Sequence, residues 1–190
     1  MHYQDLGPEF RTYQNLLKGI LNKKIQSPSL KSFPIEEEID KNGMIDKVLS
    51  VGDEVLLQIT KEPISTKGAR VSTQISLTGR YLVLIPFDQK ISVSKKIKDS
   101  QEKTRLKTLI ESIKPEGFGV IIRTVAENKK VAELHNDMNQ LIEKWNICFR
   151  NIQKNKTPCK VLSEEDRASA ILRDNFNQDF VSIICDDEQM

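Results

Sequence analysis

Apolar residues recur every three to four positions in several stretches of the chain. This spacing predicts helices over residues 8–22, 99–113 and 128–149, and a further helix around Ile171-Leu172. Asp99 with Glu102 can cap the start of the second helix, and the third carries the longest apolar stripe. A polar linker is predicted after it, over residues 150–157.

Shorter apolar runs bounded by glycine, proline and polar residues predict strands. They lie at residues 55–59, 71–75, 81–85, 91–93, 118–122, 161–162 and 180–184. The basic loop over residues 63–68 joins the first two as a hairpin. Helices and strands in this mixed order predict an α+β fold.

Composition excludes some classes of protein. The 190 residues are 38% hydrophobic, with 29 basic and 27 acidic side chains and a net charge of +2. The length suits one large domain or two small ones, and any basic surface must be local. No run of about 18 apolar residues predicts a membrane span. The amino-terminal segment lacks the pattern of a secretory signal, so a cytoplasmic location is expected.

The residues most often used in metal and catalytic sites are few. Cys148, Cys159 and Cys185 form no Cys-x-x-Cys pair, which favours buried free thiols. His2 and His135 are too scattered for a metal site and lack a nucleophile motif. The sequence therefore predicts no catalytic residue and no metal ligand.

One strand end carries candidate chemistry. The apolar run at residues 118–122 stops at Arg123-Thr124, where α/β sheets commonly hold ligands. A guanidinium fork, a hydroxyl and the amino end of the following helix would together form an anion site. A salt bridge from Arg123 to a carboxylate such as Glu127 is the alternative, and spacing alone favours it. Gly79 lets a ligand approach between two strands, or is a plain turn.

Basic side chains border the hairpin loop and a later connection. Lys61, Lys67 and Arg70 lie around the loop, and Lys95-Lys96 follows the strand at residues 91–93. Such side chains beside a small sheet suit contact with an RNA backbone. A solvated charged surface is the alternative.

Several segments, taken in order, are similar to a known family. The longest is KEPISTKGARVSTQISLTGRYLVLIP at residues 61–86. Residues 93–97, 119–124 and 171–174 continue the match, and residues 2–8 add a weaker one. The chain over about residues 50–185 thus resembles the ribonuclease E/G family, and a run of this length is specific.

The resemblance implies a layout. Residues 1–74 would be part of an OB-fold RNA-binding β-barrel with a helical insertion. Residues 75–155 would form an α/β 5′-sensor domain, and residues 156–190 would begin an RNase H-like domain.

The resemblance also assigns residues. It implies that a 5′-monophosphate is bound by Gly79, Val83, Arg123 and Thr124, and that RNA is contacted by Lys67, Lys95 and Lys96. It therefore places the phosphate interpretation of Arg123 above the salt bridge.

For the intact enzyme, the resemblance implies an endoribonuclease (hydrolase) that depends on Mg²⁺ and cleaves single-stranded RNA, in rRNA processing and mRNA decay, as a homo-oligomer. The family's catalytic aspartates would lie outside these 190 residues, so the chain alone is expected to be inactive. The alternatives are a non-catalytic RNA-binding or scaffold module and an α+β domain that binds protein.

Overall fold

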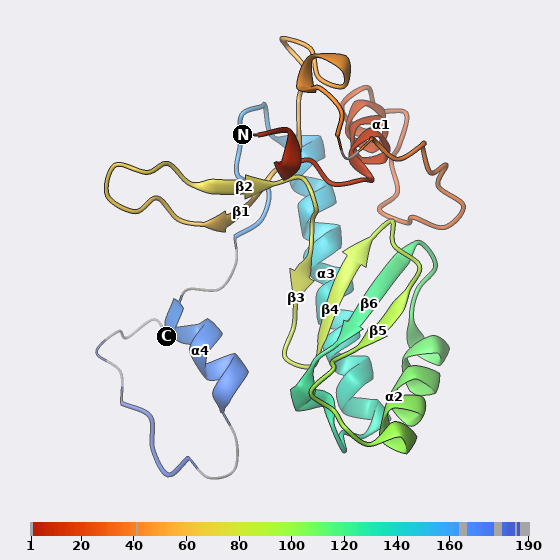
Figure 1. Ribbon diagram of the computed structural model, residues 1–190, viewed down its shortest axis with the longest axis vertical. Helices are drawn as coiled ribbons and strands as arrows, with labels where there is room; N and C mark the ends of the chain where they lie inside the picture. Colours follow the sequence, from red (N-terminus) through yellow and green to blue (C-terminus); the bar gives the residue numbers. More distant parts are fainter. Residues whose placement is uncertain (1, 41, 164–166, 177–179, 185, 187–190) are drawn as a thin grey trace.

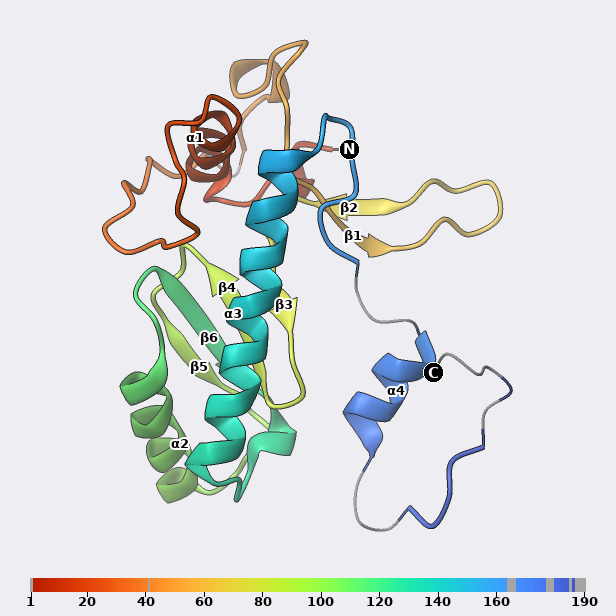
Figure 2. The same ribbon diagram turned by 180° about the vertical axis from the view of Figure 1, so that it is seen from behind.

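The computed structural model describes residues 2–40, 42–163, 167–176, 180–184 and 186. These residues form an α+β arrangement of two sheets and four α-helices, as the sequence predicted (Figure 1). The larger sheet has the long helix α3 on one face, while the β1–β2 hairpin projects to the side of the sheet (Figure 2). None of the described helices is long and apolar enough to cross a bilayer.

The larger sheet confirms most of the predicted strands. It contains β3 (Leu77–Thr78), β4 (Leu82–Pro86), β5 (Ile91–Val93) and β6 (Phe118–Ile122). The strand order is β3-β4-β6-β5. β4 is antiparallel to β3 and β6, whereas β5 and β6 are parallel. The end of β5 therefore lies beside the end of β6.

Side chains of the sheet alternate between a buried and an open face. Leu82 and Leu84 of β4 and Val120 and Ile122 of β6 are fully buried. They share one core with the apolar stripe of α3 (Val131–Lys154), which packs against β3 and β4. Ile121 points to the other face and is 38% exposed. Ile121 therefore lies on an open face, because α3 covers the opposite face of the sheet.

The helix α2 (Ser100–Ile113) packs against β5 and α3. Asp99 caps it as predicted, because its carboxylate accepts the N–H of Gln101 at 2.9 Å. Glu102 has another role. It accepts two hydrogen bonds from Arg105 at 2.6 Å and the N–H of Asn128 at 2.8 Å. Glu102 thus ties α2 to the loop before α3 instead of completing the cap.

The helix α1 (Phe10–Leu21) confirms the first predicted helix. Tyr13, Leu17 and Ile20 face the main core, and α1 contacts α3. Two short 3-10 turns, Tyr3–Asp5 and Ile45–Lys47, accompany α1 in this part of the chain.

The predicted hairpin is present but shifted. β1 (Gln58–Lys61) and β2 (Arg70–Ser72) pair antiparallel. The strand predicted at residues 55–59 begins only at Gln58, because Leu56 packs against the main core instead of pairing. Ile59 is 64% exposed on the projecting hairpin. Within the described residues 2–40 and 42–74, β1 and β2 are the strands present. The OB-fold therefore stays a prediction, and so do the domain boundaries at residues 74 and 155.

Three predictions near the carboxyl end were wrong. The helix α3 continues to Lys154, where a linker from residue 150 was expected, because Ile152 extends its buried stripe. Val161 and Leu162 pack against the core without forming a strand. Residues 180–184 form no strand either, and Val181 is fully exposed. A strand needs a paired neighbour, and no described strand lies beside this segment.

The helix α4 (Arg167–Asn175) contains Ile171 and Leu172, as predicted. In the sequence, Ser163 with Asp166 resembles a cap for this helix, and Asp166 lies outside the described residues.

The cysteines follow the prediction in part. Cys148 is a buried free thiol, and burial raises its pKa to about 11. Cys159 is exposed, contrary to expectation, because it lies beyond the end of α3. Cys185 lies outside the described residues.

Candidate functional site

Three chain segments meet at one edge of the larger sheet. Arg123 follows β6, and its N–H donates to the carbonyl of Tyr81 just before β4 (2.8 Å). Ser94 follows β5, and its N–H donates to the carbonyl of Ile122 (2.9 Å). The topology thus brings the Gly79 turn, Arg123-Thr124 and the basic pair after β5 to the same edge, although they are distant in sequence.

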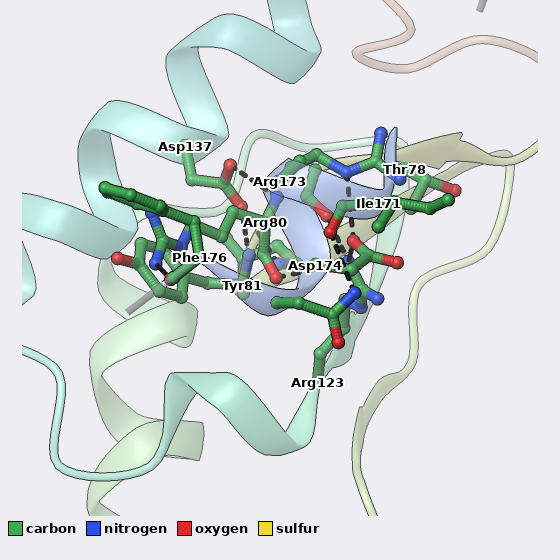
Figure 3. Close-up of polar contacts among 12 residues, drawn as sticks. Thr78, Arg80, Tyr81, Arg123, Asp137, Ile171, Arg173, Asp174 and Phe176 are labelled. Carbon is green, nitrogen blue, oxygen red and sulfur yellow. Dashed lines mark hydrogen bonds and ion pairs between the residues drawn. The ribbon is translucent and has the colours of Figure 1, made fainter. Parts of the chain in front are cut away.

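Arg123 connects this edge to α4, and Figure 3 shows its side chain directed toward Asp174. Its Nη1 donates to the carbonyl oxygens of Gly79 at 2.7 Å and Arg80 at 3.2 Å. The same nitrogen donates to Asp174 of α4 at 2.8 Å. Among the described residues, no hydrogen-bond partner is found for its Nε or Nη2. These contacts fix the guanidinium while leaving donors that an anion can use.

The salt bridge considered for Arg123 does form, but with a different partner. Asp174 takes the place proposed for Glu127, and Arg173 also donates to it at 3.1 Å. The hydrogen bond from Arg123, and to a smaller extent the one from Arg173, lowers the pKa of Asp174 to about 2. The hydrogen bond between Arg123 and Asp174 also raises the pKa of Arg123. Asp174 was missed as a site residue because it is 51 positions away in sequence.

Acidification is expected to weaken this ion pair. Asp174 has its ordinary pKa of 3.8 when unfolded and about 2 when folded. Because the folded value is the lower one, the pair stabilises the fold fully above about pH 4 and is lost as the pH falls through about 2. An NMR titration of the Asp174 carboxyl carbon should give a midpoint near 2 in the wild type and a higher one in Arg123→Ala. Equal midpoints in the two proteins would contradict the pairing.

Thr124 is bound to a residue that the sequence did not single out. Its hydroxyl lies 2.9 Å from the hydroxyl of Ser94, which also accepts the N–H of Lys96 at 3.3 Å. Ser94 therefore links the Arg123-Thr124 pair to the basic turn. No motif marks this serine, so only the parallel pairing of β5 and β6 could reveal it.

The helix expected directly after Thr124 begins later. A 3-10 turn, Thr124–Ala126, comes first, and α3 starts at Val131. The carboxylate of Glu133 accepts the N–H of Lys130 at this helix end (3.0 Å). A carboxylate of the chain thus already lies at this helix end, so the predicted contribution of the helix amino end to the anion site is not supported.

Gly79 serves the turn between β3 and β4. The buried carboxylate of Asp137, from α3, accepts the N–H groups of Arg80 at 3.0 Å and of Tyr81 and Leu82 at 2.9 Å. A Cβ at position 79 would lie 2.6 Å from this carboxylate. The close approach that the glycine allows is therefore that of Asp137. Asp137 interrupts the apolar face between Leu134 and Leu141, which was the available signal for it.

The other residues predicted to bind RNA do not all lie near Arg123. Val83 is half-buried and pairs with Ile121, whose side chain lies on the open face of the sheet next to Arg123. Lys95 and Lys96 are exposed in the turn after β5. Lys67 is exposed near the tip of the β1–β2 hairpin, which Figure 1 shows projecting away from this edge. The structure brings the basic pair to the site but not Lys67.

Possible metal ligands do not gather anywhere in the described part of the chain. Within the residues that the structure describes, no group of three or more His, Cys, Asp or Glu side chains could hold a metal ion.

Comparison with known proteins gives a consistent result. The ribonuclease E/G family model matches residues 76–190. The chain is 34% identical over 142 residues to a ribonuclease E of Nostoc sp., covering 75% of this chain and 21% of that protein. It is 35% identical over 139 residues to ribonuclease G of Haemophilus influenzae, covering 73% of this chain and 28% of that protein. A ribonuclease E/G-like protein of Pyropia yezoensis is 34% identical over 153 residues, which cover 80% of this chain and 30% of that protein. The chain thus spans less than a third of the length of these relatives.

Proposed function

The chain belongs to the ribonuclease E/G family, and from this premise we propose that it is the RNA-binding, 5′-monophosphate-sensing portion of a magnesium-dependent endoribonuclease. Its substrate class would be single-stranded RNA undergoing processing and decay. The described residues do not form a magnesium site, so no step of the cleavage reaction is assigned to them. The homo-oligomer and the cytoplasmic location belong to the same proposal.

The observation that carries the sensor proposal is the state of Arg123. Its Nη1 is held by two carbonyls and by Asp174, whereas Nε and Nη2 have no hydrogen-bond partner among the described residues. A guanidinium fixed on one side offers a planar pair of donors on the other, which matches the oxygens of a phosphate. The hydroxyls of Thr124 and Ser94 lie 2.9 Å apart at the same strand ends, and one donates to the other. Because each hydroxyl has one proton, the other hydroxyl of the pair can donate to the same anion.

The predicted RNA contacts extend this proposal. Lys95 and Lys96 would bind the backbone next to the 5′ end, because their turn is linked to Thr124 through Ser94. Lys67 would contact RNA at the projecting hairpin. Exposed lysines suit phosphate contacts that weaken as salt rises. Val83 would border the 5′ nucleotide on the open face of the sheet.

Discrimination by the 5′ end is expected to depend on Arg123. A 5′-phosphorylated oligonucleotide should bind the wild type roughly tenfold more tightly than its 5′-hydroxyl counterpart, as one charge-assisted contact provides. Arg123→Ala should bind the two oligonucleotides equally. Fluorescence anisotropy with single-stranded RNA at fixed salt measures both affinities.

The control must separate loss of the guanidinium from loss of the ion pair. Asp174→Asn removes the charge from the partner but keeps Arg123, so the preference for the 5′ phosphate should persist. If this variant loses the preference as fully as Arg123→Ala does, the position of α4 rather than the guanidinium determines the effect. A wild type that binds both RNAs equally would contradict the proposal.

We also propose that the chain alone binds RNA without cleaving it. Carboxylates fixed on rigid elements are needed to hold catalytic magnesium, and the described residues do not group them. Robust cleavage of the same oligonucleotide in the presence of Mg²⁺ would contradict this part. A scaffold module that never acted in a nuclease is disfavoured by the family membership.

A further inference from the structure

Glu102 is a buried carboxylate that does not cap its own helix. It lies in the first turn of α2 and is 8% exposed. A carboxylate is rarely buried to this extent unless hydrogen bonds satisfy its oxygens. Both oxygens of Glu102 do accept hydrogen bonds, and the donors show which part of the chain this side chain holds in place.

Glu102 and Arg105 together hold the loop between β6 and α3. Arg105 donates to both carboxylate oxygens of Glu102 at 2.6 Å. One of these oxygens also accepts the N–H of Asn128 at 2.8 Å, and Nη2 of Arg105 donates to the carbonyl of Lys129 at 3.1 Å. Figure 2 shows the start of α2 at the same end of the sheet as the start of α3. One pair of side chains on α2 therefore binds the backbone of two successive loop residues.

The loop needs such a hold at Asn128. The φ angle of this residue is 60°, in the left-handed region. Asparagine tolerates this conformation better than most residues, but a residue with a side chain keeps it only where its surroundings impose it. The hydrogen bond from its N–H to Glu102 is such a constraint. Without this bond, the loop is expected to adopt other conformations.

Backbone hydrogen bonds connect the held loop to Arg123-Thr124. The N–H of Lys129 donates to the carbonyl of Ala126 at 3.1 Å. The N–H groups of Ala126 and Glu127 donate to the carbonyls of Arg123 and Thr124, each at 3.1 Å. The turn that contains Thr124 therefore has its far end fixed by α2.

A second contact leads from the same loop toward Arg123. The Nζ of Lys129 lies over the ring of Tyr81, 5.6 Å from its centroid. The carbonyl of Tyr81 accepts the N–H of Arg123 at 2.8 Å. The conformation of the loop thus acts on Arg123 from the turn that follows it and from the strand beside it.

We propose that Glu102 is a positioning residue of the 5′-phosphate site. Through Asn128 and the turn at residues 124–126, it fixes the orientation in which Arg123 and Thr124 meet the phosphate. The inference rests on the proposed function, because that function places the phosphate at these two residues. Glu102 itself does not touch the ligand. Its effect is large because charge-assisted hydrogen bonds depend strongly on alignment.

Two substitutions of Glu102 separate positioning from charge. Glu102→Ala and Glu102→Gln remove the same negative charge, which by electrostatics alone would strengthen phosphate binding equally in both. Only glutamine keeps an acceptor oxygen for the N–H of Asn128. Positioning therefore predicts a loss in the alanine variant and rescue in the glutamine variant.

The measured quantity is the ratio of the affinities for 5′-phosphorylated and 5′-hydroxyl single-stranded RNA, from fluorescence anisotropy at fixed salt. In Glu102→Ala the ratio should fall from roughly tenfold to below roughly threefold, as expected when a hydrogen bond to a charged group is misaligned. In Glu102→Gln it should stay within roughly twofold of the wild type. The affinity for the 5′-hydroxyl RNA should be the same in all three proteins, which a general loss of structure would not allow.

A matched variant controls for the loss of a carboxylate from α2. Glu111 is exposed on this helix, so Glu111→Ala should keep the wild-type ratio. Circular dichroism checks that every variant is folded. Arg105→Gln removes the contact to Lys129 at a more exposed position and should lower the ratio by a smaller factor than Glu102→Ala. The positioning role is refuted if Glu102→Ala keeps the ratio, or if Glu102→Gln or Glu111→Ala lowers it as much.

Hydrogen exchange without RNA separates this inference from the proposed function. In Glu102→Ala the N–H groups of Ala126 and Glu127 should exchange roughly tenfold faster than in the wild type, because the loop opens locally. If the wild type does not prefer phosphorylated RNA, the proposed function fails, and the positioning role falls with it. If the wild type shows this preference and Glu102→Ala exchanges faster but retains it, only the positioning role is overturned.

Discussion

Replacing Asp137 by alanine is expected to lower the free energy of unfolding by about 3–4 kcal/mol, since it leaves several backbone donors of one turn unsatisfied. The carboxylate is 4% exposed and accepts three N–H groups, of which that of Leu82 is buried. Water cannot replace the carboxylate fully at such a depth. Urea unfolding followed by circular dichroism measures the change.

The neighbouring position provides the control. Asn136 is exposed on the same helix, so Asn136→Ala should change stability by less than about 0.5 kcal/mol. Asp137→Asn keeps one acceptor oxygen and should fall between the two. If Asp137→Ala is no more destabilising than Asn136→Ala, the carboxylate does not hold the turn.

If the chain senses the 5′ end as proposed, the same substitution should also weaken that binding. Asp137 orders the turn whose carbonyls, those of Gly79 and Arg80, fix the guanidinium of Arg123. With the turn loosened, the preference for a 5′ phosphate should fall although Arg123 is intact. Asp137 would therefore act as a positioning residue.

Replacing Trp145 by alanine should destabilise the fold by about 3–5 kcal/mol, the range for removal of a large buried aromatic side chain. Trp145 is 2% exposed and packs edge-on against Phe118 of β6, with ring centroids 5.9 Å apart. Its indole N–H donates to the carbonyl of Pro28 at 2.8 Å. One side chain thus joins α3, the sheet and the segment after α1.

Two variants of α3 calibrate this effect. Trp145→Phe keeps a ring but loses the hydrogen bond, so it should cost less than the alanine variant. Ile147 is 36% exposed, and Ile147→Ala should cost less than about 1 kcal/mol. Because Trp145 is the single tryptophan, unfolding must be followed by circular dichroism rather than fluorescence. Similar losses for Trp145→Ala and Ile147→Ala would contradict the packing described.

The sequence alone determined the elements whose residues carry a strong local pattern. The stripe of α3, the cap of α2 at Asp99 and the apolar strand β6 are local features, because periodicity and caps involve residues within a few positions of one another. The long ordered resemblance also determined the family. Where the prediction failed, as at residues 180–184, apolar composition was present but a pairing partner was not among the described residues.

Only the tertiary structure decided how the candidate site is built. Asp174 and Asp137 reach their partners across 51 and 55–57 positions, and Ser94 meets Thr124 across 30. No local pattern encodes these pairings, because they result from the strand order β3-β4-β6-β5 and from the packing of α3 and α4 at one sheet edge. The sequence could place an arginine at the end of a strand. Which of its nitrogens are engaged, and which remain without a partner among the described residues, depended on segments that folding brings together.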